Sequence, residues 1–410
     1  MQLVLSCPSS CLPPLTTPRC RRTRPCVQPP RRARGGCTAG AQRDGPIRLA
    51  RYPGWHNDGA SAPRHRRPGG IVVPQQTDTD SGFAELLEPY RRELQVHCYR
   101  MTGSYDEAED LVQETFLKAW RSREAYEGRA SVRTWLYRIA TNTCLDHLRR
   151  HRRTPHPYER LPGMEHGKGE PPTRIEWLQP YPDDLLADIP AEEAGPESQA
   201  LSRETVELVF LAALQHLPPR QRAVLILRDV VGLPATETAG LLELSTASVN
   251  SALQRARPAL REHLPAGRRT EWAPAAAPTR EEREVVERYR DAAERLDLSA
   301  MAELLTADAK LTMPPNPFWF VGREAILAFI GQALDPASPM YFGQWRHLPT
   351  WANGLPAVGG YVQRPGTTVY RAQNLDVLRI EDGRIAEITT FEPHLLPAFG
   401  LPLKISEQER

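Results

Sequence analysis

Residues 219–264 read PRQRAVLILRDVVGLPATETAGLLELSTASVNSALQRARPALREHL and decide the fold of their part of the chain. The run predicts three short amphipathic helices, with a tight turn at Glu243-Leu244-Ser245 between the second and the third. Ser245 or Thr246 is the candidate N-cap of the third helix, because a hydroxyl there can accept a bond from an unpaired backbone N–H. Four apolar residues recur at helical spacing and form the inner face of this helix: Val249, Leu253, Ala256 and Leu260.

The outer face of the third helix carries short polar donors followed by arginines: Ser248, Asn250, Ser251, Gln254, Arg255 and Arg257. Small polar groups reach base edges in a major groove, and arginines bind guanines or phosphates. The segment therefore predicts a DNA-reading helix-turn-helix; an ordinary helical hairpin with a solvated face is the alternative. Pro258 is expected to kink or end the helix near Arg255, which would weaken phosphate contacts by Arg257 and Arg261.

A second segment, residues 104–153, reads SYDEAEDLVQETFLKAWRSREAYEGRASVRTWLYRIATNTCLDHLRRHRR. Its runs 110–116, 135–142 and 146–150, followed by the helix-turn-helix, resemble the extracytoplasmic-function (group 4) branch of the bacterial sigma-70 family. The two segments then correspond to regions 2 and 4 of that family. The resemblance implies a promoter-specificity subunit of RNA polymerase, which recognises the −10 and −35 promoter elements, melts the −10 region, is not an enzyme and needs no cofactor.

One face of the first segment is a candidate contact with core RNA polymerase. Asp106 can cap a helix whose apolar side leaves Asp110, Gln113 and Glu114 projecting together. Taken alone, this pattern favours a solvated acidic face. The resemblance assigns the face to the β′ clamp helices of the polymerase, whose arginines an acidic, amide-bearing surface suits; it also implies a contact with the β flap. The predicted core-polymerase-binding residues are Asp106, Asp110, Gln113, Glu114 and Phe116.

A loop that contains Glu127, Gly128 and Arg129 leads into an aromatic helix, and the stretch of interest is 129–142. Opened promoter DNA needs stacking platforms, basic grooves and a pocket for a flipped base. By resemblance this loop and helix hold the −10 element, although Trp135 is equally well a core residue. The basic run that follows suits duplex phosphates, with a solvated helix end as the alternative. The predicted −10 residues are Arg133, Trp135, Arg138, Asn142, Arg149, Arg150, Arg152 and Arg153, and the outer face of the third helix given above is the predicted −35 set.

The charge distribution and the positions of the cysteines limit the classes of protein to which the chain can belong. The formal net charge is +2, but thirteen arginines against two acidic residues in the first seventy positions leave the remainder net acidic by nine. DNA binding must then use local basic patches or a larger complex. Five of the seven cysteines fall in the first forty residues, and Cys98 and Cys144 are expected to be small buried hydrophobes. No disulfide framework, metal site or membrane span is predicted, which favours a cytoplasmic protein.

The predicted fold is multidomain, with two all-α domains followed by an α+β cone. The expected divisions are a disordered Arg/Pro-rich extension (1–76), region 2 (77–153), a linker (154–200), the region 4 helix-turn-helix (201–264), a second linker (265–279), the cone (280–400) and a tail (401–410). In the cone, helices are expected over 281–296 and 298–305. Asp382-Gly383 lies between two alternating segments and predicts a type I′ hairpin.

The linker contains one motif with aromatic residues and leucines, Trp177-Leu178-Gln179-Pro180-Tyr181-Pro182-Asp183-Asp184-Leu185-Leu186. It resembles the Trp-Leu-Pro-Glu-Pro motif of sigma factors with a fused C-terminal domain. In those proteins the linker packs against the fused domain. The predicted regulatory residues are Trp177, Leu178, Pro180, Tyr181 and Pro182. A linker that only threads the polymerase channel is the alternative.

Within residues 280–400, Leu304-Leu305-Thr306-Ala307-Asp308-Ala309 stands before the first expected strand. With the order of helices and strands, this run resembles the SnoaL-like, ketosteroid-isomerase-like cone. Such cones enclose a pocket, which could hold an unknown small ligand; its candidate lining is Trp319, Trp345, His347, Trp351, Tyr370 and His394. The carboxylates Asp308, Asp376 and Glu387 are expected at the surface, so no general base is assigned. A regulatory cone is favoured over two rivals, a DNA-tethered cone-fold isomerase, hydrolase or cyclase, and a one-component repressor.

Overall fold

The computed structural model of the chain describes residues 77–126, 131–187, 207–264 and 279–406, which belong to one structural unit. The predicted extension over 1–76, residues 127–130 of the −10 loop, residues 188–206, the second linker over 265–278 and the last residues 407–410 lie outside the described residues. None of the helices in the described ranges is both long enough and apolar enough to cross a membrane.

The helical domain, residues 77–153, is built from four helices and two short 3-10 turns. They are α1 (Thr77–Leu87), η1 (Glu88–Tyr90), α2 (Arg91–Thr102), α3 (Tyr105–Arg121), η2 (Arg123–Ala125) and α4 (Val132–Arg150). Helix α3 begins at Ser104, whose hydroxyl accepts a hydrogen bond from the Glu107 N–H at 3.3 Å. The prediction that Asp106 caps this helix was therefore wrong, since Asp106 lies inside the first turn. Cys98 and Cys144 are fully buried, as predicted.

The helix-turn-helix domain, residues 207–264, contains α7 (Leu208–Gln215), α8 (Pro219–Leu225), a π-helical turn η3 (Ile226–Val230), α9 (Ala235–Leu242) and α10 (Thr246–Glu262). Glu243 adopts a left-handed conformation (φ 55°) in the turn, and the Ser245 hydroxyl caps α10 by accepting from the Ser248 N–H at 3.1 Å. The turn was predicted, and Ser245 is the cap of the two predicted candidates, Ser245 and Thr246. The predicted inner face of α10 is buried.

Helix α10 does not end near Arg255, one of the two outcomes predicted for Pro258, because it continues to Glu262. Pro258 and Gln254, four residues before it, both lie on the exposed side of the helix. The carbonyl that loses its backbone partner therefore faces water, which can satisfy it. The arginines around the proline remain on a continuous helix.

The linker, residues 154–187, has more structure than its weak periodicity indicated. It contains an antiparallel pair, β1 (His156–Pro157) and β2 (Thr173–Arg174), and a short helix, α5 (Asp184–Ala187). Tyr158, Ile175, Leu178 and Tyr181 are buried. The segment therefore packs as part of the folded unit.

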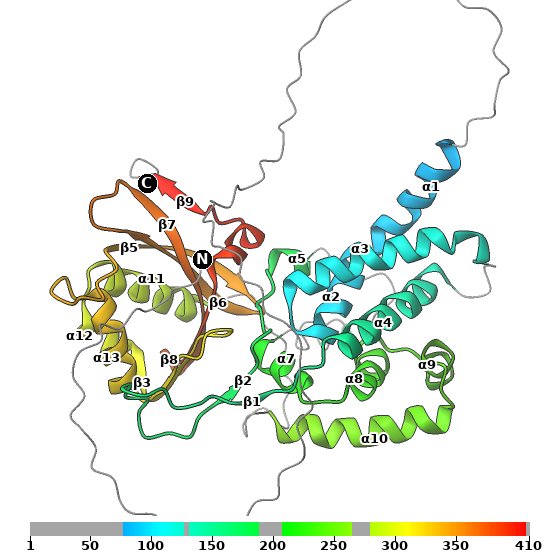
Figure 1. Cartoon of the computed structure of the whole chain (residues 1–410), viewed down its shortest axis with the longest axis horizontal. Helices are drawn as coiled ribbons and strands as arrows, with labels where there is room; N and C mark the ends of the chain where they lie inside the picture. Colours follow the sequence, from blue (N-terminus) through cyan, green and yellow to red (C-terminus); the bar gives the residue numbers. More distant parts are fainter. Residues whose placement is uncertain (1–76, 127–130, 188–206, 265–278, 407–410) are drawn as a thin grey trace, which may run out of the picture. The chain divides into compact units, whose positions relative to one another are not determined.

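The cone, residues 279–406, wraps three helices with one sheet (Figure 1). The helices are α11 (Arg280–Glu294), α12 (Leu298–Leu304) and α13 (Arg323–Leu334), and a 3-10 helix, η5 (Pro393–Phe399), follows the last long strand. The strands are β3 (Leu305–Thr312), β4 (Trp319–Val321), β5 (Gln344–Ala352), β6 (Leu355–Gln363), β7 (Val369–Glu381), β8 (Arg384–Phe391) and β9 (Lys404–Ser406). Their order is β4-β3-β8-β7-β6-β5, with β9 beside β7; β3 and β8 are parallel and the other pairs antiparallel.

The β7–β8 hairpin has the predicted turn. Asp382 and Gly383 have φ values of 49° and 70°, and Glu381 pairs with Arg384. Positive φ at both central residues is the requirement of a type I′ turn.

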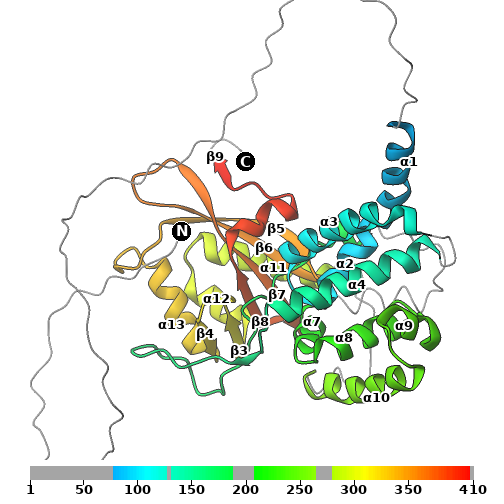
Figure 2. The ribbon, with the colours of Figure 1, turned by 45° about the vertical axis from the view of Figure 1, so that its right-hand side comes forward.

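The two faces of this sheet bury different partners. On the inner face, Leu378 and Ile388 share a core with residues of α11, α12 and α13. On the outer face, Leu375 and Val377 belong to the core that the helical domain, the linker and the helix-turn-helix domain also share. Because successive side chains of a strand point to opposite faces, β7 connects the cone's own interior to the rest of the unit. Figure 2 shows the same sheet from a second direction.

Candidate polymerase and nucleic-acid interfaces

Helix α10 presents its predicted −35 residues to solvent. Five of the six are exposed, and Ser251 is half-buried. Arg255 donates to the Ser251 hydroxyl at 2.8 Å, which leaves most of its guanidinium facing outward. Arg257 donates two bonds to the Asp229 carboxylate, both at 2.8 Å, and this pairing raises the pKa of Arg257. Arg255 is thus the freer of the two arginines for a base contact.

Helix α4 holds several of its predicted −10 residues in contacts within the molecule. Arg133 donates to Glu93 at 2.8 Å, and Arg138 donates to Glu243 of the helix-turn-helix domain at 3.0 Å. Trp135 is half-buried, with its ring 4.9 Å from that of Tyr126 and 6.3 Å from that of Phe83. The structure therefore places Trp135 at the edge of the core.

The basic end of α4 divides into two groups. Asn142, Arg149, Arg150 and Arg152 are exposed. Arg153 is half-buried; it donates to both carboxylate oxygens of Glu107, at 2.8 and 2.6 Å, and its guanidinium lies 4.6 Å from the ring centre of Trp177. Arg153 thus joins the helical domain to the linker.

The predicted polymerase face of α3 is accessible to solvent except, in part, at the N-terminal end of the helix, where other parts of the chain bind Asp106. Asp110 and Gln113 are exposed. Glu114 is half-buried and pairs with Lys118 at 2.8 Å, and the hydrogen bond from Lys118 lowers the pKa of Glu114. Phe116 is half-buried, with the Arg91 guanidinium 4.7 Å from its ring centre.

Asp106 is bound by two other parts of the chain. Its carboxylate accepts from the Gln179 side-chain amide at 2.7 Å and lies 3.1 Å from Nε2 of His394 in the cone. The Asp106 N–H donates to the Gln179 side-chain oxygen at 3.0 Å. A residue predicted to bind polymerase is therefore covered in part by the linker and the cone.

A buried arginine joins the helix-turn-helix domain to the helical domain, and sequence reasoning missed it. Arg222 of α8 donates to the Gln215 side-chain oxygen at 2.7 Å, to the carbonyls of Gln215 and Leu217 at 3.0 and 3.1 Å, and to the carbonyl of Met101 in α2. Burial lowers the pKa of Arg222 to about 9. The Trp177 indole N–H donates to the same Gln215 oxygen at 3.2 Å. The only sequence signal was a charged residue inside an apolar helix.

The linker and the cone meet at Asn353. The Asn353 side-chain oxygen accepts from the Tyr181 N–H at 2.8 Å, and the Asn353 N–H donates to the Tyr181 carbonyl at 3.0 Å. The Asn353 side-chain amide donates to the Tyr99 hydroxyl at 3.0 Å, which itself donates to the Gln179 carbonyl at 2.7 Å. One buried asparagine thus connects the cone, the linker and the helical domain. The Asn-Gly dipeptide predicts a hairpin turn, but not these contacts.

Asp183 completes this junction. Its two carboxylate oxygens accept from the Gly354 N–H at 2.9 and 3.1 Å. Burial raises the pKa of Asp183 to about 6, and the bond from Gly354 opposes that shift. The junction therefore contains a carboxylate that titrates closer to neutrality than an ordinary aspartate.

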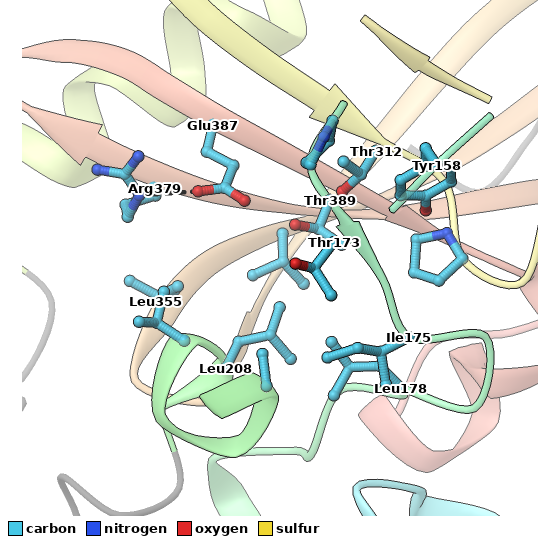
Figure 3. A pocket seen from close by; sticks show the side chains of 15 residues that line it. Tyr158, Thr173, Ile175, Leu178, Leu208, Thr312, Leu355, Arg379, Glu387 and Thr389 are labelled. Atoms are coloured by element: carbon cyan, nitrogen blue, oxygen red, sulfur yellow. Dashed lines mark hydrogen bonds and ion pairs between the residues drawn. The ribbon is translucent and has the colours of Figure 1, made fainter. Parts of the chain in front are cut away.

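The pocket found among the described residues is not where the sequence placed it. It lies on the outer face of the sheet (Figure 3). None of the six predicted lining residues, Trp319, Trp345, His347, Trp351, Tyr370 and His394, borders it. His394 is exposed and contacts Asp106, while Trp319 is fully buried and donates its indole N–H to the Glu159 carbonyl at 2.8 Å. The prediction assumed that the cone opens on its inner face.

The inner face of the sheet packs against α11, α12 and α13. Asp376 is buried there, contrary to the expectation of a surface carboxylate, and it accepts from the Tyr289 hydroxyl at 3.0 Å and from the Thr390 hydroxyl at 2.7 Å. Burial raises the pKa of Asp376. Asp308 is exposed, as expected, whereas Glu387 is half-buried, borders the outer pocket and pairs with Arg379 at 3.1 Å.

Comparisons with known families match the three folded parts separately. The family described as Sigma-70 region 2 matches residues 86–154, Sigma-70, region 4 matches residues 207–260, and the SnoaL-like domain matches residues 286–388. Regions 2 and 4 in one chain define a sigma factor of the sigma-70 type, here with a SnoaL-like extension.

Individual relatives show which branch of the sigma-70 type the chain is similar to. The chain is 44% identical over 323 residues to the ECF RNA polymerase sigma factor SigG of Mycobacterium tuberculosis, covering 78% of this chain and 84% of that protein. It is 29% identical to the ECF RNA polymerase sigma factor SigW of Bacillus subtilis, over 47% of this chain and 94% of SigW. The solved structure of the M. tuberculosis sigma factor SigJ matches with a TM-score of 0.48 and 22% identity, over 78% of this chain and 99% of that one.

The chain belongs to the ECF sigma factor family. It is a sigma factor that binds RNA polymerase, recognises promoters and directs transcription initiation, so its main function is not enzymatic.

Proposed function

We propose that the cone regulates this sigma factor by docking on the linker and holding the two DNA-reading domains together. The observation that carries the proposal is the bonding of Asn353 to Tyr181 and Tyr99. These groups come from the cone, the linker and the helical domain. Regulation by the fused cone is thus a matter of geometry, and no turnover by the cone is required.

The residue roles follow the surfaces described above. Asp110, Gln113, Glu114 and Phe116 contact the β′ clamp helices, with Asp106 joining them once it is uncovered. The exposed residues of α10 read the −35 element, and α4 with its basic end holds the −10 element. The helix-turn-helix domain also contacts the β flap, and the protein works in the cytoplasm because core polymerase and the chromosome are there.

The two promoter elements require the DNA-reading helices to be far apart. Positions −35 and −10 lie about 25 base pairs apart, which at about 3.4 Å per base pair is roughly 85 Å along straight DNA. In the structure, Arg138 of α4 bonds to Glu243, two residues before the cap of α10. This closed arrangement cannot occupy both elements at once, so the domains must separate before initiation.

The experiment uses Asn353→Gly in the full-length protein. Asn353 has φ 57°, a conformation that glycine adopts freely, so the variant keeps the turn and removes only the side-chain bonds to Tyr181 and Tyr99. Asp382→Gly is the matched control, because Asp382 occupies the equivalent position of the exposed β7–β8 turn.

The readout is run-off transcription with purified core polymerase over a range of core concentrations. We expect Asn353→Gly to give several-fold more transcript than wild type when core is limiting, and Asp382→Gly to behave as wild type. Equal activity of all three proteins at every core concentration would overturn the regulatory role of the docked cone.

A further inference from the structure

The outer-face pocket is formed jointly by three parts of the chain. Its volume is about 110 Å³. The linker contributes Tyr158, Pro172, Thr173, Ile175 and Leu178; α7 contributes Leu208, Val209 and Ala212; and the cone contributes Thr312, Pro314, Leu355, Val377, Arg379, Glu387 and Thr389. Protein interiors contain few voids larger than a water molecule. A space of this size, where three parts meet, is a candidate binding site.

The pairing register of the strands shows on which face of the sheet this pocket lies. Thr312, Thr389 and Val377 lie opposite one another on β3, β8 and β7, and therefore share one face. Leu378 and Ile388, one residue along each strand, face α11, α12 and α13 instead. The pocket is thus separated from the cone's interior by the thickness of the sheet.

The lining combines an apolar wall with a short polar edge (Figure 3). Leu208, Leu355, Ile175 and Leu178 form the apolar part. The hydroxyl groups of Thr173, Thr312 and Thr389 and the paired side chains of Glu387 and Arg379 supply the polar part. The Glu387 carboxylate has lone pairs beyond the one that Arg379 Nε occupies. Apolar walls with a few placed polar groups are typical of small-molecule sites.

We propose that this pocket binds a small, mainly apolar molecule that carries one hydroxyl group, and that binding stabilises the closed arrangement. The second half rests on the proposed function of the cone. A ligand that touches the linker, α7 and the cone together loses most of its contacts when they separate. It therefore binds the closed arrangement preferentially and shifts the equilibrium toward it.

The cavity volume sets the size of the ligand and hence the probe. An enclosed apolar cavity of about 150 Å³ binds benzene. This pocket is smaller but partly open to solvent, so part of a ligand can project from it, and a single ring with a hydroxyl group is the largest ligand expected here. Phenol is the probe, and benzene is its match without the hydroxyl. A molecule of this size binds a good pocket with a dissociation constant on the order of 1 mM.

Amide hydrogen exchange in the full-length protein reports on the closed arrangement directly. The Asn353 N–H bonds to the Tyr181 carbonyl, and the Gln179 N–H bonds to the Gly103 carbonyl at 2.9 Å. Both bonds join different parts of the chain. We expect phenol at about ten times its dissociation constant to slow exchange at both amides by roughly tenfold.

Two variants test whether phenol acts from this pocket. Ala212→Phe fills the space from α7 and should abolish the response to phenol. Thr389→Val keeps the shape and removes the hydroxyl, so it should weaken phenol several-fold and leave benzene unchanged. Thr389→Val keeps the test valid if Ala212→Phe fails to fold.

Two results would overturn the proposal: unchanged exchange in wild type with phenol up to about 10 mM, or the same phenol response in wild type and both variants. Either result leaves the proposed function standing if Asn353→Gly still raises transcription. A third outcome separates the two proposals. If Asn353→Gly does not change transcription but phenol slows exchange in wild type and not in the pocket variants, the pocket is a binding site and the docked cone does not regulate transcription.

Discussion

Helices α10 and α4 both carry residues predicted to bind DNA, but the two helices differ in how many of those residues bond elsewhere in the molecule. The outer face of α10 is exposed apart from the pairing of Arg257 with Asp229. On α4, Arg133 pairs with Glu93, and Arg138 pairs with Glu243 of the other DNA-reading domain. On the proposed roles, the −35 surface needs little rearrangement to reach DNA, whereas Arg133 and Arg138 of the −10 surface must first release contacts within the molecule.

The largest expected effect is on polymerase binding. Asp110→Arg combined with Glu114→Arg should leave the fold intact, because Asp110 is exposed and Glu114 makes only a surface pair with Lys118. Charge reversal should repel the basic partner and abolish binding of core polymerase in a pull-down assay. Glu303→Arg on the exposed side of α12 is the control and should bind as wild type. Retained binding by the folded double variant would remove the assigned role from this face.

Arg222→Leu tests what holds the two domains together. The substitution leaves the carbonyls of Met101 and Leu217 without their arginine partner in a buried site. We expect a loss of about 3 kcal/mol in the free energy of unfolding, measured with urea. Arg220→Leu, at an exposed position of the same helix, should change stability by less than about 0.5 kcal/mol. Equal effects of the two substitutions would show that the buried network contributes nothing specific.

Asp183 predicts a pH dependence of cone docking. Its pKa is raised to about 6 in the closed arrangement and should return to about 3.9 when the junction opens. The closed arrangement therefore binds the proton more tightly, so its stability is fully present below about pH 4 and falls as the pH rises through 6. The whole change is at most about 3 kcal/mol.

Exchange of the Asn353 amide should accordingly be faster at pH 7.5 than at pH 5.5, after correction for the intrinsic pH dependence of exchange. Asp183→Asn should remove this difference, because asparagine still accepts from the Gly354 N–H but does not titrate. A corrected pH dependence that persists in Asp183→Asn would assign it to another group.

Binding to promoters with different −35 sequences compares two arginines of α10, Arg255 and Arg257. Arg255→Ala should cost roughly 1–3 kcal/mol on promoters with the preferred −35 sequence and less on altered ones, if the arginine contacts a guanine. Arg257→Ala should cost less, because Arg257 must first leave Asp229. Filter binding or footprinting of the holoenzyme on both promoters measures the two effects. A loss by Arg255→Ala that is equal on all −35 sequences would identify a phosphate contact.

Local patterns predicted the elements of this fold well. The Ser245 cap, the inner face of α10 and the Asp382-Gly383 turn depend on neighbouring residues only, and all three were correct. Pro258 was misjudged because the cost of a missing backbone bond depends on whether the orphan carbonyl faces water, which the helix pattern alone does not fix.

The contacts between the parts could not be predicted in the same way. Asn353 reads as a turn residue and Arg222 as a helix residue, yet their partners Tyr181 and Met101 lie more than a hundred positions away. The outer-face pocket was not predicted, because strand alternation gives two faces without saying which one the rest of the chain covers. Resemblance to a family supplied the roles of the DNA-reading surfaces, and residue patterns alone left them open.

The central claim, that the free protein is closed and opens on polymerase, is tested most directly by a distance between α4 and α10. Fluorophores placed at the exposed positions Arg149 and Glu262 by unnatural amino acids avoid the five cysteines of the first forty residues. We expect high energy transfer in the free full-length protein and low transfer once core polymerase is added, with Asn353→Gly already shifted toward low transfer. The same low transfer in free wild type, Asn353→Gly and the polymerase complex would contradict the account.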